Sequence, residues 1–294
     1  MPSRWMTGGK GLDAFREAML HDTQIRVMHD YLDCQEVFPN VAIEGGICYY
    51  RWDKGENGLC DFVSHSKGMV NIATRALCEN GSDVVIRNVD ALSILKKTEK
   101  DYKSNPFSNI VSPRNPFRIS DVEISSHKSD RFCCEIFGRF DGSRSVKYTT
   151  SLTLHENGQK LLKNWKVFIS KADGAAGQLG NPIPARIIGK SELGNPNMVC
   201  TETFLAIGPF NTKGESVNVQ KYLETRFLRF LVGIRKLKNM TQDTYSFVPL
   251  QDFTENSDID WSDSIEGIDR QLYKKYGLTK EEIDFIESMI KPME

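Results

Sequence analysis

The stretch Met1–Leu20, MPSRWMTGGKGLDAFREAML, decides how the chain begins to fold. Its glycine-rich segment GGKG (8–11) is not a phosphate-binding loop, because such a loop follows a buried strand and its lysine precedes Ser or Thr, whereas Gly11 follows Lys10. Apolar residues then recur at helical spacing, at Leu12, Phe15, Ala18 and Met19. The glycines are therefore predicted to turn the chain into a helix, because glycine adopts backbone angles that other residues resist.

Strands are predicted after this helix, over Ile25–Leu32 and Ile43–Trp52, with a third, short strand over Leu59–His65. A further helix is predicted from Val84 to Lys103. A loop, a helix and then strands are typical of the last third of an α/β domain. The first fifty residues are therefore expected to be a fragment without a complete sheet of its own.

The middle of the chain alternates loops with short strands. Segment 104–120 carries three prolines and is predicted to be a loop, and strands are predicted within 131–140, 146–154 and 164–172. Segment 171–190 is a second glycine-rich loop with basic residues at both ends. This pattern favours an irregular α+β fold over repeated βαβ units.

The C-terminal third contains two predicted helices. The first spans Val219–Met240, and its apolar residues Leu223, Phe227, Phe230, Leu231 and Ile234 share one face. An acidic stretch over 252–267 is predicted to be an exposed loop. A short final helix is predicted after Thr279, which has capping-box spacing to Glu282.

Charge is unevenly distributed along a chain whose 38 basic and 39 acidic residues nearly cancel. Residues 160–240 hold thirteen Lys or Arg against five Asp or Glu, and residues 241–294 hold five against thirteen. The seven cysteines show no metal-binding or disulfide spacing, and no signal segment or membrane-spanning run is present. The chain is therefore expected to be cytoplasmic, with a basic block that suits a nucleic acid.

Familiar catalytic patterns are not supported. The glycines of GAAGQLG (174–180) are followed by Pro182 and Pro184, which oppose the helix that a nucleotide or adenosylmethionine fingerprint requires. The two Asn-Pro-Phe triplets lack the second proline of the methyltransferase motif, and the aspartates of the acidic stretch have no nuclease partner. We therefore assign no catalytic, cofactor-binding or metal-binding residue.

The basic residues of the 219–240 helix have two interpretations. Arg226, Arg229 and Lys236 fall opposite its apolar face and suit either a solvated surface or contacts to DNA phosphates. Lys171, Arg186, Lys190, Arg235 and Lys238 lie nearby in sequence and favour the second interpretation, because phosphate binding needs several cations on one surface.

Several motifs occur in the order found in one enzyme family. They are PSRWMTGGKGLDAFREAML (2–20), VFPNVAIEGGICYYRWDK (37–54), FSNIVSPRNPF (107–117), VCTETFLAIGPF (199–210), YLETRFLRFLVGIRK (222–236), YSFVPLQDF (245–253) and LYKKYGLTKEEIDFIESMI (272–290). Over nearly its whole length the chain resembles the C-terminal half of adenine-specific DNA methyltransferases of type II restriction–modification systems. In that family the cofactor-binding and base-flipping elements precede the PSRW stretch.

The resemblance implies an α+β chain with four parts. Residues 1–56 would be the last part of a Rossmann-like methyltransferase sheet, a helix plus antiparallel edge strands, and 57–103 a connecting strand and helix. Residues 104–253 would be an irregular α+β target-recognition domain, and 254–294 an acidic loop and a C-terminal helix. Such a chain lacks the motifs for S-adenosylmethionine, the cofactor of the complete enzyme, and is expected to be inactive alone.

The expected function is therefore sequence-specific recognition of double-stranded DNA, with no membrane association. The residues expected to contact DNA are Arg114, Arg118, Lys171, Arg186, Lys190, Arg226, Arg229, Arg235, Lys236, Gln242 and Tyr245. The alternative is a working methyltransferase or endonuclease subunit that completes its active site with a separately encoded N-terminal half. In either case this N-terminal half is an expected partner.

Overall fold

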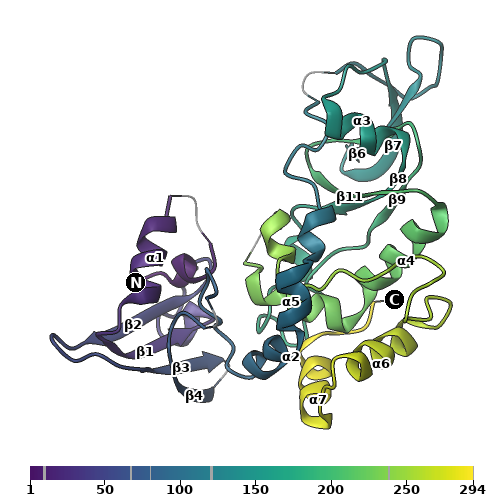
Figure 1. The fold of residues 1–294 in the computed structure, drawn as a ribbon. Helices are drawn as coiled ribbons and strands as arrows, with labels where there is room; N and C mark the ends of the chain where they lie inside the picture. The colour runs from purple at the N-terminus through teal and green to yellow at the C-terminus, as the bar shows by residue number, and fades with distance from the viewer. Residues whose placement is uncertain (9–10, 67, 80, 120–121, 238, 294) are drawn as a thin grey trace.

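The computed structural model describes residues 1–294 except 9–10, 67, 80, 120–121, 238 and 294. The fold is α+β, as predicted from the sequence (Figure 1). The helices of the described residues are α1 (Asp13–His21), α2 (Ala91–Ser104), α3 (Glu156–Lys163), α4 (Lys213–Glu224), α5 (Arg226–Arg235), α6 (Ile265–Lys275) and α7 (Lys280–Met289). They accompany three small sheets among those residues, and no closed barrel is formed there.

The N-terminal lobe, residues 1–83, is built on the first sheet. Its strands are β1 (Ile25–Tyr31), β2 (Ile47–Trp52), β3 (Cys60–Ser66) and β4 (Met69–Arg75), in the order β2-β1-β3-β4. The β1–β2 pair is antiparallel, as the resemblance implied, and β1 is parallel to β3. Trp5, Met28 and Phe62 form part of a separate hydrophobic core beneath this sheet. The first fifty residues thus supply two strands, and the following segment completes the sheet.

Two further sheets lie next to one another in the C-terminal lobe, residues 90–293 (Figure 1). One has the order β10-β6-β7-β5 and the other β11-β8-β9. The strands are β5 (Ile124–Ser125), β6 (Cys134–Phe140), β7 (Ser143–Thr149), β8 (Trp165–Ser170), β9 (Glu192–Gly194), β10 (Met198–Cys200) and β11 (Phe204–Phe210). Phe137, Phe168 and Phe204 pack together in one core, which joins the two sheets.

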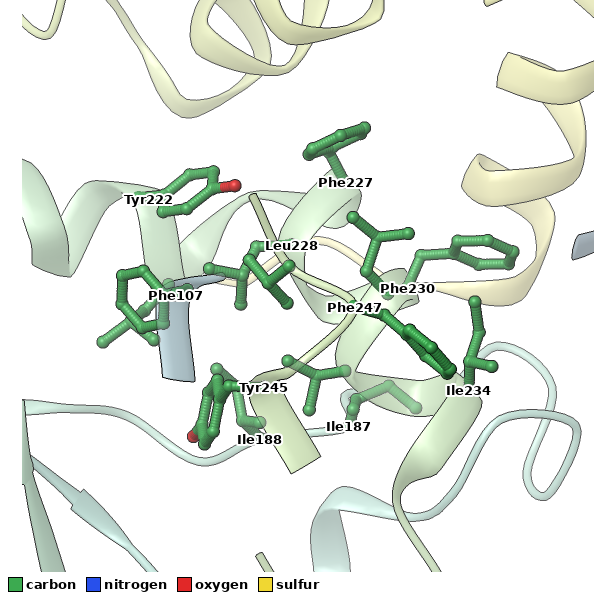
Figure 2. Close-up of a cluster of buried hydrophobic side chains, with 14 of the residues drawn as sticks. Phe107, Ile187, Ile188, Tyr222, Phe227, Leu228, Phe230, Ile234, Tyr245 and Phe247 are labelled. Atoms are coloured by element: carbon green, nitrogen blue, oxygen red, sulfur yellow. The ribbon is translucent and has the colours of Figure 1, made fainter. Parts of the chain in front are cut away.

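The largest core surrounds helix α5. Figure 2 shows Phe227, Phe230 and Ile234 of this helix in one cluster with Ile187 of the second glycine-rich loop and Phe247 of a later segment. The predicted apolar face is therefore correct, because every residue assigned to it is buried. The loop residues Ala185, Ile187 and Ile188 belong to the same core. The side chains of a glycine-rich loop thus help to hold the C-terminal lobe together.

The predicted helix over 219–240 is wrong in its bounds, because the chain forms two helices that meet at Thr225. Thr225 has extended backbone angles, and its hydroxyl accepts a hydrogen bond from the Leu228 N–H at the start of α5. Hydroxyl side chains favour such N-cap positions. An N-cap residue inside an apolar periodic pattern therefore divides the segment into two helices, although periodicity alone predicts a single helix.

Other boundaries also differ from the prediction. The helix expected from Val84 begins only at Ala91, and residues 84–89 form an extended connection between the lobes in which Val85 and Ile86 pack into different cores. Helix α6 was not predicted, and its N-cap Ser264 lies inside the stretch that was predicted to be an acidic loop. The capping box of Thr279 and Glu282 at the start of α7 is confirmed.

Asp269 of α6 is expected to make stability depend on pH. Its buried carboxylate accepts the N–H groups of Arg226 and Phe227 at 2.9 and 3.0 Å, and burial raises its pKa to about 6 despite these bonds. The folded state therefore holds a proton that the unfolded state loses from about pH 4 upward. The free energy of unfolding should fall by about 2–3 kcal/mol from this group between about pH 4 and pH 6.

Urea denaturation of the wild type and of Asp269→Asn over this pH range measures the effect, because asparagine does not titrate. The free energy of unfolding of the wild type, minus that of Asp269→Asn, should fall by about 2–3 kcal/mol as the pH rises from about 4 to 6. A difference that stays constant across the range would contradict a raised pKa at Asp269.

Candidate nucleic-acid interface

A cleft of about 590 Å³ lies where the two lobes meet. The N-terminal lobe contributes Arg4, Arg16, Glu44 and Asp83 to its wall, and the C-terminal lobe contributes Arg114, Arg235, Asn239, Thr241 and Asp243. A second cleft of about 840 Å³ shares Glu44 and Leu237 with the first. It is lined by the loop that follows β1 and by the second glycine-rich loop. The clefts therefore form one continuous depression along the junction of the lobes.

Two of the cations in this depression are available to a ligand. Arg4 and Arg114 are exposed, and neither side chain pairs with an acidic residue within the described part of the chain. Arg114 was predicted from the sequence as a DNA contact. Arg4 was not predicted as a DNA contact. It lies in the PSRW stretch, and that motif was the signal that could have identified it. Their free N–H groups can donate to phosphate oxygens.

Arg235, also a predicted contact, holds the lobes together. Its guanidinium binds both carboxylate oxygens of Asp83, at 2.6 and 2.8 Å, and this pairing lowers the pKa of Asp83. Arg16 donates to the backbone oxygen of the same aspartate at 2.9 Å. A guanidinium that is already paired has fewer donors left for phosphate. Arg235 and Arg16 therefore have a structural role, which is to shape the cleft at the lobe junction.

The predicted loop cations belong to the second glycine-rich loop, of which Asp173 lines the second cleft. Arg186 forms an ion pair with Asp173 at 2.9 Å, and Lys171 lies 3.8 Å from Glu202. Lys190 is exposed, and Arg144 donates to its backbone oxygen at 2.7 Å. Arg144 belongs to β7 and was missed, because nothing in a strand sequence reveals which loop it faces. Arg186 thus lies beside the second cleft through Asp173, whereas Lys171 and Lys190 contribute to neither cleft wall.

Three predicted contacts are buried. Arg229 and Lys236 are 0% and 4% exposed and donate to backbone carbonyls rather than facing solvent. Tyr245 is 0% exposed and contacts Met240. Lys236 remains close to the second cleft, because it contributes to that wall. These side chains make internal contacts and do not form a basic helix surface.

The remaining candidates are scattered. Arg226 pairs with Glu287 at 3.3 Å on the helical side of the C-terminal lobe. Gln242 donates to the Ser108 carbonyl, and Arg118 is exposed in a loop. Lys238 and the residues Gly9 and Lys10 of the first glycine-rich turn lie outside the described residues. The structure thus brings together Arg114 and Arg235 at the first cleft, and leaves Lys171, Lys190, Arg118 and Arg226 outside both cleft walls.

Within the described residues, no group of three or more His, Cys, Asp or Glu side chains is arranged to hold a metal ion. The same part of the chain contains no helix that is long and apolar enough to cross a membrane.

Comparisons with known proteins find a weak structural likeness. No protein-family model matches the chain, and no curated protein matches it. The crystal structure of the type IIG restriction endonuclease BpuSI is similar to it with a TM-score of 0.35 and 11% sequence identity. The match covers 91% of this chain and 41% of that enzyme, so the chain spans less than half the length of its neighbour. This is a weak similarity in shape to a restriction–modification enzyme.

Proposed function

We propose that the chain recognises double-stranded DNA for an adenine-specific methyltransferase of a restriction–modification system. The observation that carries the proposal is the depression between the lobes, whose wall holds Arg4 and Arg114, both exposed and without an acidic partner among the described residues. Cations on one surface supply the salt-dependent part of DNA binding, and the order of the sequence motifs supports the methyltransferase assignment.

Amide side chains in the clefts are suited to reading bases. Gln35, Gln178 and Asn181 contribute to the wall of the second cleft, and Asn239 contributes to that of the first. Asn and Gln form paired hydrogen bonds with the major-groove edge of adenine. We propose that these residues read bases while the arginines fix the register on the phosphates.

The partner that we propose is an N-terminal methyltransferase half. S-adenosylmethionine would bind to that half, because no residue of this chain is assigned to the cofactor. Calorimetric titration of this chain with S-adenosylmethionine tests the assignment. Heat of binding from the isolated chain would contradict it.

DNA binding is expected to weaken steeply with salt and to depend on Arg4 and Arg114. The double variant R4A/R114A should lower the affinity for a fluorescein-labelled duplex about tenfold or more at low salt. It should also reduce the slope of log K against log salt by about 2, because each lost phosphate contact removes about 0.9. Fluorescence anisotropy between about 50 and 200 mM salt measures both quantities.

The matched control is Lys54→Ala, which removes an exposed cation from the turn between β2 and β3 and does not line either cleft. It should leave the salt slope nearly unchanged. If K54A, which removes one charge, had half the effect of R4A/R114A, which removes two, binding would depend on net charge and not on the cleft. Selection from a random duplex pool then tests sequence specificity, and the absence of any enriched sequence would contradict the recognition role.

A further inference from the structure

The N-terminal sheet has one open edge. Its strand order is β2-β1-β3-β4, so β2 and β4 are the two edge strands. The β2 edge is covered at its start, because the Cys48 N–H donates to the Met1 carbonyl at 2.8 Å and Pro2 forms a bridge with Ile47. No backbone group of β4 has such a partner outside β3 within the described residues. The open edge of this sheet is therefore β4.

The pairing of the neighbouring strand shows which residues of β4 face this edge. The His65 carbonyl on β3 accepts the Leu32 N–H, so the backbone groups of His65 point towards β1. Backbone groups alternate in direction along a strand, and β3 pairs with β4 without a bulge. The backbone groups of Asn71 and Ala73 therefore point towards β3. The N–H and C=O groups that point towards the open edge are those of Val70, Ile72 and Thr74.

The features that normally protect an edge strand from pairing with another chain are missing from β4. Protected edge strands are usually short, bulged or interrupted by proline or lysine. The sequence of β4, MVNIATR, has seven residues without proline or lysine, and its one charged residue, Arg75, is buried. The outer face of the strand carries Val70 and Ile72, which are 52% and 65% exposed. An exposed apolar edge of this length is a template for a further strand.

The strand is self-complementary in an antiparallel arrangement. When two copies meet about a two-fold axis at Ile72, the two Ile72 residues face one another, and Val70 faces Thr74 of the second copy. Each of these facing pairs exchanges two hydrogen bonds, so the two edges form about six. Facing β-branched side chains pack favourably, and no charged residue lies among the facing pairs. The alternate residues, Asn71 and Ala73, are also uncharged.

We propose that the chain forms a two-fold symmetric dimer in which the β4 strands of two copies pair antiparallel and join the two N-terminal sheets into one. A second copy brings a strand that is already formed, whereas a disordered segment would lose conformational entropy on pairing. The assembly is closed, because the pairing uses the open edge of both copies. Neither cleft is lined by β4, so this dimer is independent of the proposed DNA recognition.

The size of the contact sets the expected strength of the dimer. The paired edge is a strip about 23 Å long and about 10 Å wide, which is much smaller than the roughly 800 Å² per partner of a standard interface. We therefore expect a weak dimer, with a dissociation constant of about 10–100 µM.

Sedimentation velocity of the full chain from about 1 to 300 µM tests the proposal, and it should show a monomer converting to a dimer as the concentration rises. Hydrogen exchange at both ends of this range, read by mass spectrometry at residue resolution, locates the interface. Exchange at the amides of Val70, Ile72 and Thr74 should slow about threefold or more at the higher concentration. The amides of Asn71 and Ala73 should be protected at both concentrations, because they face β3.

Ile72→Lys places two like charges opposite one another at the two-fold axis, so it should weaken the dimer about tenfold or more. The replaced side chain is exposed, so the monomer should keep its fold. Val146→Lys is the matched control, because it makes the same kind of change at a 42% exposed valine of β7, a strand with a neighbour on both sides. This control should leave the dissociation constant unchanged.

Three results would overturn the proposal. The first is a chain that stays monomeric to about 300 µM, which would leave the edge to a strand of another protein. The second is a dimer that forms without protection of the three edge amides. The third is an Ile72→Lys variant that dimerises as tightly as the wild type. The exchange pattern of the wild type decides the question even if the lysine variant does not fold.

Discussion

Replacing Asp30 by alanine is expected to lower the free energy of unfolding by about 3–5 kcal/mol, because it leaves a buried arginine without its counter-ion. Asp30 is 0% exposed on β1 and binds Arg87 through both carboxylate oxygens, at 2.7 and 2.8 Å. It also accepts a hydrogen bond from the Ser3 hydroxyl at 2.7 Å. One carboxylate thus fixes both the N-terminal turn and the connection between the lobes to the sheet. Chemical denaturation followed by circular dichroism measures the loss.

Asp61→Ala is the matched control for this variant. Asp61 is exposed on the neighbouring strand β3 and accepts a hydrogen bond from Thr74. Its removal should cost about 1 kcal/mol or less. The double variant D30L/R87M, which replaces the ion pair by apolar side chains, should recover much of the lost stability. Equal costs for D30A and D61A would contradict the structural role of the buried pair.

Replacing Arg229 by alanine is the second change with a large expected effect, again about 3–5 kcal/mol. The fully buried guanidinium donates to four backbone carbonyls, those of Glu224, Thr225, Arg186 and Lys291. The Thr225 and Arg186 carbonyls also accept the backbone N–H groups of Arg229 and Ile188, so alanine would mainly deprive the Glu224 and Lys291 carbonyls of their donor and create a cavity in the largest core. Thermal and urea unfolding should both show the loss of stability. The hydrogen bond to the Arg186 carbonyl also links Arg229 to the loop beside the second cleft.

Arg226→Ala provides the comparison, because this neighbouring arginine pairs with Glu287 near the surface. Ion pairs of this kind contribute about 1 kcal/mol or less, so the variant should remain close to the wild type in stability. Arg229→Lys should lose most of the stability that alanine loses, since a lysine cannot reach four separate acceptors. A near-neutral Arg229→Ala would show that the carbonyls find other partners.

Local patterns in the sequence predicted most of the regular structure. Alternating and helical hydrophobicity identified β1, β2 and the apolar face of α5, and the spacing of Thr279 to Glu282 identified the start of α7. Errors arose where tertiary contacts overrule local preference. Residues 84–89 satisfy a helical pattern, yet they extend between the lobes because Val85 and Ile86 are drawn into different cores.

The basic residues show the same difference between local patterns and tertiary contacts. The sequence by itself determined that the chain is α+β and that its central block is basic, because composition and periodicity are local properties. Only the tertiary structure decided which cations remain exposed and which are buried or paired. It buried Arg229 and Lys236 against backbone carbonyls and paired Arg235 with Asp83, 152 residues away. Charge is a property of each residue, but availability depends on long-range partners, so Arg4 and Arg114 stand out only in the folded chain.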